Sequence, residues 1–215
     1  SLFPLKYESE RDHSPYSNIR IVPKKDIEIL ISKLFIDNNL SHIIEEKLGM
    51  SFCVDFFAYY VTKHIPKGED DDPFYANNWH HDSQFTSNSL KLFILPEDVT
   101  ESHGPLSWIT SVDSQDIIER SYLNGLSHNT LSHVKYMKFI GKKGSASFVR
   151  PNICLHKAGI PIYGLEREQI MIQLNPSSSF SIREDLYNRQ FMSEPNMPII
   201  KNLFRKKNIL RESNT

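Results

Sequence analysis

The segment Trp79-His80-His81-Asp82 combines imidazole and carboxylate groups at a spacing that could bind a metal ion. On a strand, side chains two positions apart point to the same side, so His80 and Asp82 would converge while His81 faces the opposite way. An imidazole with a carboxylate suits Fe(II) better than the sulfur-rich sites of structural zinc. The triplet alone is a weak signal in a chain with 9 histidines. A third ligand must therefore come from elsewhere in the fold.

His156 is the best candidate for that third ligand, because it ends a short predicted strand. A turn-rich stretch, Ala158 to Gly164, follows it, and the chain then reverses into a second predicted strand, Arg167 to Leu174. A hairpin of this shape brings the start of the second strand beside the end of the first. We therefore expect Arg167 to lie near His156.

Two imidazoles, one carboxylate and a guanidinium together suggest one kind of chemistry. Two histidines and a carboxylate occupy one face of an octahedral Fe(II) and leave the other face open. A 2-oxo acid could chelate the metal there and leave a position for O2, while an arginine fork would bind the far carboxylate of 2-oxoglutarate. The protein would then position a C–H bond of the substrate and exclude water.

Three further residues could line this site, and each has an ordinary structural alternative. Lys91 lies in an apolar predicted strand and could pair with a carboxylate of the co-substrate or substrate, or could point to solvent. Alternation turns either Tyr59 or Tyr60 inward, and Tyr59 is our candidate to bind the co-substrate, with core packing as the alternative. Gln173 has the same strand parity as Arg167 and could line the same pocket.

Residues near these segments give weaker signals. Gln84, Arg150 and Asn152 could contact a substrate. The acidic run Glu69 to Asp72 lacks the regular ligand spacing of a calcium loop, which favours a solvated loop at the rim of the pocket.

The rest of the sequence predicts the elements that position these residues. Lys24 to Ile36 and Asn39 to Leu48 have helical periodicity, and Ser51 to Thr62 is rich in the aromatic and branched residues of a long strand. A later helix is predicted at Ser114 to Leu123. Short strands are predicted at Leu90 to Leu95, Pro105 to Ile109, Tyr136 to Ile140, Ser145 to Val149, Ile153 to His156 and Gln169 to Leu174.

Many short predicted strands that follow N-terminal helices indicate a mainly β domain, a sandwich or barrel with flanking helices. The 215 residues suffice for one domain with a sizeable core. Along the chain we expect an irregular leader (1–20), a helical flank (21–50), a β core (51–176) and a C-terminal extension (177–215) with an amphipathic helix over Pro198 to Arg211.

The composition of the chain limits the classes of partner that we expect it to bind. A formal net charge of -1 gives no basic face for nucleic acid, and no apolar run reaches the roughly 18 residues of a membrane helix. Cys53 and Cys154 are too few for a disulfide framework and lie in apolar runs, which favours reduced core residues and a cytoplasmic setting. We therefore expect a small-molecule substrate, with neither a nucleic-acid nor a membrane partner.

These motifs resemble the phytanoyl-CoA dioxygenase family of Fe(II)/2-oxoglutarate oxygenases. The H-x-D triplet of that family resembles His80 to Asp82, its N-G-P-L turn resembles Ser102 to Leu106, and its G-D-x-x-x-F strand resembles Gly144 to Phe148. Its distal histidine and its 2-oxoglutarate arginine match His156 and Arg167.

The resemblance covers about Phe52 to Pro176 and implies a double-stranded β-helix, that is, a cupin-like jelly roll with N-terminal helices. It implies that His80, Asp82 and His156 bind Fe(II) and that Arg167 binds 2-oxoglutarate. The implied activity is the hydroxylation of a small organic substrate by O2, with release of succinate and CO2.

Two other functions stay open. One is a cupin-type metal-dependent isomerase or hydrolase that does not use 2-oxoglutarate, and Arg167 argues against it because such chemistry needs no guanidinium there. The other is a catalytically inactive jelly-roll binding module, and the intact set of His80, Asp82 and His156 argues against it.

Overall fold

The structure is a computed structural model of the chain, and it describes residues 9–11, 16–66, 75–82, 88–121, 131, 134–183 and 186. Gln84, the acidic run 69–72 and the predicted helix 198–211 lie outside the described residues.

Two helices precede the long strands, as predicted. Helix α1 (Lys24–Ile31) continues as a π-helical segment, η1 (Ser32–Asp37), and α2 (Leu40–Leu48) follows. Helix α2 ends at Gly49, whose φ of 68° is the left-handed conformation that glycine adopts most easily. The buried residues of α1 and η1, Ile27, Leu30, Ile31 and Phe35, recur at helical spacing, which explains why one stripe of these helices packs on the sheet.

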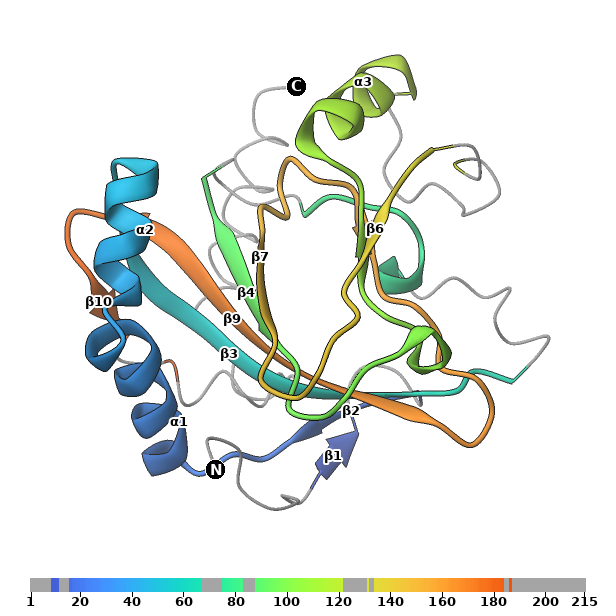
Figure 1. The fold of residues 1–215 in the computed structure, drawn as a ribbon, viewed down its shortest axis with the longest axis horizontal. Helices are drawn as coiled ribbons and strands as arrows, with labels where there is room; N and C mark the ends of the chain where they lie inside the picture. The colour runs from blue at the N-terminus through green and yellow to red at the C-terminus, as the bar shows by residue number, and fades with distance from the viewer. Residues whose placement is uncertain are drawn as a thin grey trace, which may run out of the picture.

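The larger sheet has seven strands, and its centre is the long antiparallel pair β3 and β9 (Figure 1). In spatial order its strands are β1 (Ser9–Arg11), β2 (Ser17–Arg20), β3 (Ser51–Lys63), β9 (Glu166–Ser177), β4 (Leu90–Ile94) and β7 (Ala146–Val149), with β10 (Ser181–Ile182) paired to β3. The prediction of an irregular leader over 1–20 is therefore wrong for β1 and β2. These strands form because β2 pairs along the end of β3, with Ser17 opposite Thr62.

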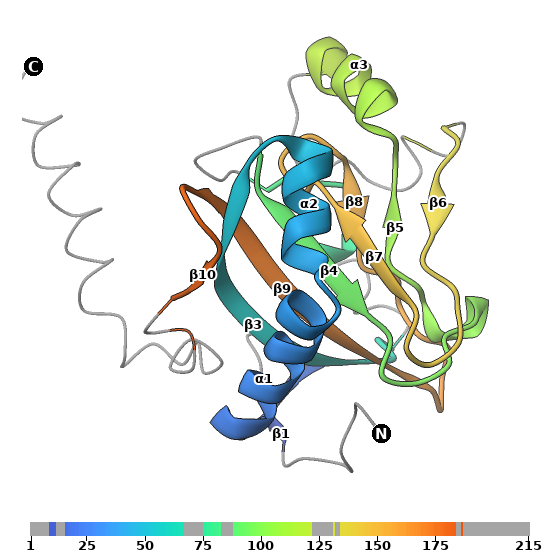
Figure 2. The same ribbon diagram turned by 60° about the vertical axis from the view of Figure 1, so that its left-hand side comes forward.

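The smaller sheet has three strands in the order β6 (Met137–Lys138), β5 (Ser107–Trp108) and β8 (His156–Lys157) (Figure 2). They are shorter than predicted, and residues 151–154 form turns, so the predicted strand Ile153 to His156 begins only at its last residue. Short 3-10 helices lie at η2 (Tyr75–Asn77) and η3 (Glu101–His103).

Helix α3 (Ser111–Ser121) begins three residues before the predicted Ser114. The reason is local: the hydroxyl of Thr110 accepts a hydrogen bond from the backbone N–H of Asp113 (3.2 Å), as an N-cap residue does. The last two residues of the predicted helix, 122 and 123, lie outside the described residues.

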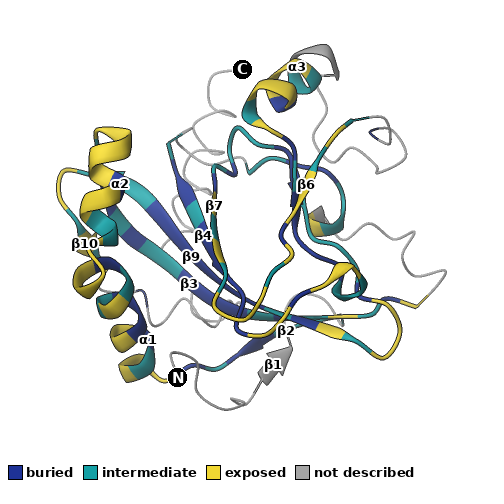
Figure 3. Cartoon of the chain, viewed as in Figure 1, coloured by how far each residue is buried: buried dark blue, intermediate teal, exposed yellow. Residues whose placement is uncertain are grey.

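Apolar clusters cover both faces of the larger sheet. On one face, Ile170, Ile172 and Leu174 of β9 pack against α1 and η1. On the other face, Phe93 and Met171 pack against residues that flank the smaller sheet, Leu106 and Phe139 among them. Figure 3 shows buried residues along β3 and β9 and exposed residues on the outer sides of the helices. Within the described residues, no helix combines the length and the apolar character that crossing a membrane requires.

Candidate metal centre

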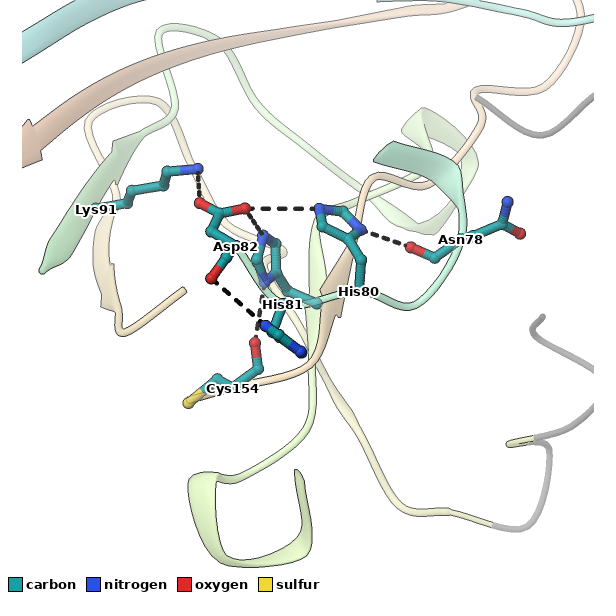
Figure 4. A network of polar contacts seen from close by, with 7 residues as sticks. Asn78, His80, His81, Asp82, Lys91 and Cys154 are labelled. Atoms are coloured by element: carbon teal, nitrogen blue, oxygen red, sulfur yellow. Dashed lines mark hydrogen bonds and ion pairs between the residues drawn. The ribbon is translucent and has the colours of Figure 1, made fainter. Parts of the chain in front are cut away.

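His80, Asp82 and His156 meet at one point, although His156 lies 76 positions after His80 along the chain (Figure 4). Their potential ligand atoms all lie within 4.8 Å of one another. Oδ1 of Asp82 is 3.9 Å from Nε2 of His80 and 3.6 Å from Nε2 of His156. Both histidines are only 5% exposed, so the three groups face each other in a largely dry site.

The main chain fixes this arrangement. The N–H of His80 donates to the carbonyl of His156 (3.0 Å), and the N–H of His156 donates back to the carbonyl of His80 (2.8 Å). The N–H of Asp82 donates to the carbonyl of Pro151 (2.9 Å). The segment that contains His80 and Asp82 is therefore bridged to the start of β8. Because side chains alternate along an extended backbone, His80 and Asp82 lie on the same side.

Both imidazoles turn their Nε2 atoms toward Oδ1 of Asp82. Nδ1 of His80 lies 2.7 Å from the carbonyl of Asn78, and Nδ1 of His156 lies 3.0 Å from the carbonyl of Cys154. A carbonyl can only accept, so each Nδ1 carries the proton and Nε2 keeps its lone pair. Burial lowers the pKa of both rings, that of His156 to about 4, which keeps them in the neutral form that metal binding requires. The donor set therefore fits a divalent metal such as Fe(II).

Lys91 forms an ion pair with Oδ2 of Asp82 (Figure 4). Burial alone would raise the pKa of Asp82, but the ammonium of Lys91 and the two neighbouring histidines together outweigh it and hold that pKa below its usual value. From the sequence, Lys91 could pair with a carboxylate of the co-substrate or substrate, or point to solvent. The structure turns its side chain inward, 14% exposed, with Asp82 as its partner, and contact with a co-substrate stays a prediction.

A cavity of about 410 Å³ adjoins the cluster. His80, His156 and Lys91 line it together with Arg167 and residues of β2, β3 and β9. Among the described residues, no acidic side chain lines this cavity.

Arg167 is a buried cation in the wall of this cavity, 3% exposed. Its Nη1 donates to the carbonyl of Gly159 (3.0 Å) and its Nη2 to the hydroxyl of Thr62 (3.1 Å). Its Nε has no hydrogen-bond partner, and no carboxylate of the described residues forms an ion pair with it. Burial lowers its pKa to about 10, which still leaves it charged at neutral pH. A buried cation with only neutral partners is suited to bind an anionic ligand.

Gln169 lies two residues along β9 from Arg167 and also lines the cavity. It is 6% exposed, and its Nε2 has no hydrogen-bond partner among the described residues. Our reading of the sequence missed Gln169 and Thr62. The signal was present for Gln169, which has the strand parity of Arg167, whereas Thr62 could be found only from the pairing of β3 with β9.

Tyr59, our candidate to bind the co-substrate, does not line the cavity, and its place in the structure fits the alternative of core packing. Its hydroxyl donates to Oε2 of Glu168 (2.5 Å), and Arg20, which forms an ion pair with Glu168, lies over its ring. Burial and the bond to Glu168 raise the pKa of Tyr59. Tyr59 packs in the cluster beneath the helices, whereas Tyr60 lines the cavity, because β3 pairs Tyr60 with Gln169.

Gln173 was also predicted to line the pocket beside Arg167. It lies on the cavity side of β9, opposite Lys91 in the pairing with β4, but it does not line the cavity. Arg150 and Asn152, which could have contacted a substrate, do not line the cavity either. Arg150 instead donates to Oδ1 of Asn88 (3.0 Å).

Comparison with known proteins supports the architecture. The sequence matches no protein-family model and no curated protein. The solved structure of SnoN, described as a non-heme alpha ketoglutarate dependent epimerase from nogalamycin biosynthesis, matches 78% of this chain at 13% identity with a TM-score of 0.53. HygX from Streptomyces hygroscopicus, solved with nickel and 2-oxoglutarate bound, matches 80% of this chain at 8% identity with a TM-score of 0.51.

The fold is a jelly roll. At such low identities the likeness shows the fold alone, and it confirms the predicted mainly β, cupin-like class. The match spans 65% of the SnoN chain, which is less than two thirds of its length, and 74% of the HygX chain. The resemblance to the phytanoyl-CoA dioxygenase family stays a prediction, because no family model matches.

Proposed function

We propose that this jelly roll is an Fe(II)- and 2-oxoglutarate-dependent dioxygenase that hydroxylates a small organic substrate. One observation carries the proposal: a two-histidine, one-carboxylate cluster and a buried arginine without a carboxylate partner among the described residues line or adjoin the same cavity. The first feature suits Fe(II), and the second suits the far carboxylate of a dicarboxylic co-substrate.

In this proposal, Nε2 of His80, Nε2 of His156 and Oδ1 of Asp82 hold the iron. The carbonyls of Asn78 and Cys154 keep the two rings oriented through their Nδ1 protons. When bound, iron and 2-oxoglutarate supply the oxidation of a C–H bond by O2, with release of succinate and CO2. The buried walls around the cluster exclude water from that chemistry.

Arg167 would anchor the co-substrate. The hydroxyl of Thr62 and the carbonyl of Gly159 orient its guanidinium but leave its charge unneutralised. Gln169 adds an amide donor two residues away on the same face of β9. Tyr16, Ser17 and other residues of the cavity wall remain to contact the substrate.

The cupin-type alternative without 2-oxoglutarate leaves the buried charge of Arg167 unexplained, and an inactive binding module leaves the intact ligand set unexplained. HygX was solved with 2-oxoglutarate bound, and SnoN is described as dependent on alpha ketoglutarate, a synonym of 2-oxoglutarate, which is consistent with the proposal. SnoN is named an epimerase, so the reaction assay must separate hydroxylation from epimerisation.

The decisive experiment is anaerobic. Protein loaded with Fe(II) and 2-oxoglutarate should develop a weak visible charge-transfer band, which His156→Ala and Asp82→Ala should abolish. His42→Ala, on the exposed face of α2, is the matched control and should keep the band. Bound iron without a band would overturn the proposal. A substrate panel scored by succinate release, with a product heavier by one oxygen atom, would then separate hydroxylation from epimerisation.

A further inference from the structure

The ion pair between Lys91 and Asp82 divides the two carboxylate oxygens between different tasks. Oδ2 contacts the ammonium of Lys91, whereas Oδ1 is the oxygen that lies 3.6 and 3.9 Å from the two Nε2 atoms. Both side chains are 14% exposed, so solvent screens this pair only in part. Figure 4 shows Lys91 reaching Asp82 from the side opposite to His80.

The sheet holds Lys91 in this place. In the register of the sheet, Lys91 of β4 lies between Gln173 of β9 and Val149 of β7, so its backbone is anchored on both sides. Its side chain projects from the same face as Phe93, two residues along, and both residues line the cavity. Among the described residues that line the cavity, Lys91 is the only lysine.

This division has two physical consequences for a metal. A carboxylate with both oxygens free can bind a cation through one oxygen or through both. A second oxygen on the iron would occupy one of the three positions that two histidines and a carboxylate leave open, and a chelating co-substrate and O2 together need all three. A positive charge that contacts a metal ligand also repels the metal itself.

We propose that Lys91 is a positioning residue that confines Asp82 to one metal-binding oxygen, weakening metal affinity while keeping the co-substrate position open. The inference rests on the proposed function, because it concerns the same metal site. It predicts opposite changes in two affinities when Lys91 is replaced: the affinity for the metal should rise, and the affinity for 2-oxoglutarate should fall. A residue that merely supports the fold would weaken both.

Ni(II) provides a readout without turnover. Its affinity, measured by competition with a coloured chelator, should rise about tenfold in Lys91→Met, since even water-like screening leaves a repulsion of that size between a unit charge and a nearby divalent ion. In the Ni(II)-loaded protein, the affinity for 2-oxoglutarate should fall by about tenfold or more. Lys91→Arg keeps the charge and should restore both values toward wild type. Unchanged or weaker Ni(II) binding in Lys91→Met would overturn the inference.

The controls separate this inference from the proposed function. Lys157→Met removes another half-buried lysine, one whose ammonium lies over the ring of Trp79, and should change neither affinity. Wild-type protein that binds no Ni(II), or binds it equally well in His80→Ala, would instead reject the metal site. If Lys91→Met does not fold, Lys91→Gln serves as the neutral variant of similar length.

A double-mutant cycle in metal-free protein tests the pair itself. Lys91→Met and Asp82→Asn should each lower the unfolding midpoint, because each leaves one charge without its partner in a mostly buried site. The double variant should lose less than the sum of the two. Additive losses would show that the two side chains do not interact and would overturn the inference.

Discussion

Arg167 and Thr62 face each other across the two central strands of the larger sheet. The register of β9 and β3 pairs the two residues, and Nη2 of Arg167 donates to Oγ1 of Thr62 over 3.1 Å. The carbonyl of Gly159 accepts from Nη1 on the other side of the guanidinium. Neutral acceptors thus hold the cation in place without neutralising it, so the cavity keeps a positive charge for a ligand.

Replacing this cation should mainly affect the co-substrate. In Arg167→Met, the affinity of Ni(II)-loaded protein for 2-oxoglutarate should fall by on the order of 3–5 kcal/mol, because the ligand carboxylate loses its buried charge partner. Titration calorimetry would measure the loss. Arg183→Met, at an exposed arginine that pairs with Asp55, is the control and should bind normally. An unchanged affinity in Arg167→Met would remove Arg167 from its proposed role.

Gln169 should show opposite effects on stability and binding. Gln169→Leu removes a buried amide donor without a partner among the described residues, so the metal-free protein should keep its stability or gain about 1 kcal/mol. The affinity for 2-oxoglutarate should fall by about 0.5–1.5 kcal/mol, the net contribution of one hydrogen bond. Thermal unfolding and calorimetry check the two signs. A less stable protein with normal binding would show that the amide serves the fold.

The metal ligands should make the thermal stability of the protein depend on metal. At a free Ni(II) concentration of 100 times its Kd, binding adds about 2.7 kcal/mol, a rise in Tm of roughly 5–10 °C for a chain of this length. A chelator should reverse the rise, and His80→Ala and His156→Ala should abolish it. His42→Ala should show the full shift. Equal shifts in all four proteins would mean that Ni(II) binds elsewhere.

The close approach of two glycines should couple stability to co-substrate binding. A Cβ at Gly159 would lie 2.7 Å from the carbonyl carbon of Gly104, and the carbonyl of Gly159 holds Arg167. Gly159→Ala should therefore destabilise the protein by about 1–3 kcal/mol and also weaken 2-oxoglutarate binding.

Gly164→Ala is the control in the same loop. Gly164 has a φ of 83° and open space around it, so a side chain there costs about 1–2 kcal/mol of backbone strain. Gly164→Ala should leave the affinity for 2-oxoglutarate unchanged. If Gly159→Ala loses only stability as well, the carbonyl of Gly159 does not position Arg167.

Local patterns in the sequence determined α1, α2, the long strand β3 and the shared side of His80 and Asp82. Helical spacing of Ile27, Leu30 and Ile31 predicted α1, and it did so because one stripe of a helix must bury its apolar residues. Period-two spacing brought His80 and Asp82 to the same side, because alternation is a property of any extended backbone. The mainly β class followed from the number of such short segments.

Only the tertiary structure decided which face of the central sheet each polar residue reaches. β3 pairs with β9 in a register that contains an irregularity between Val54 and Phe56, and this pairing puts Tyr60 in the cavity and Tyr59 beneath the helices. The partner of Lys91 was equally hidden, since Asp82 meets it only when the sheets face each other. Strand β2 has little local apolar pattern and forms because it pairs with β3. Register and facing depend on contacts between distant segments, which local spacing does not encode.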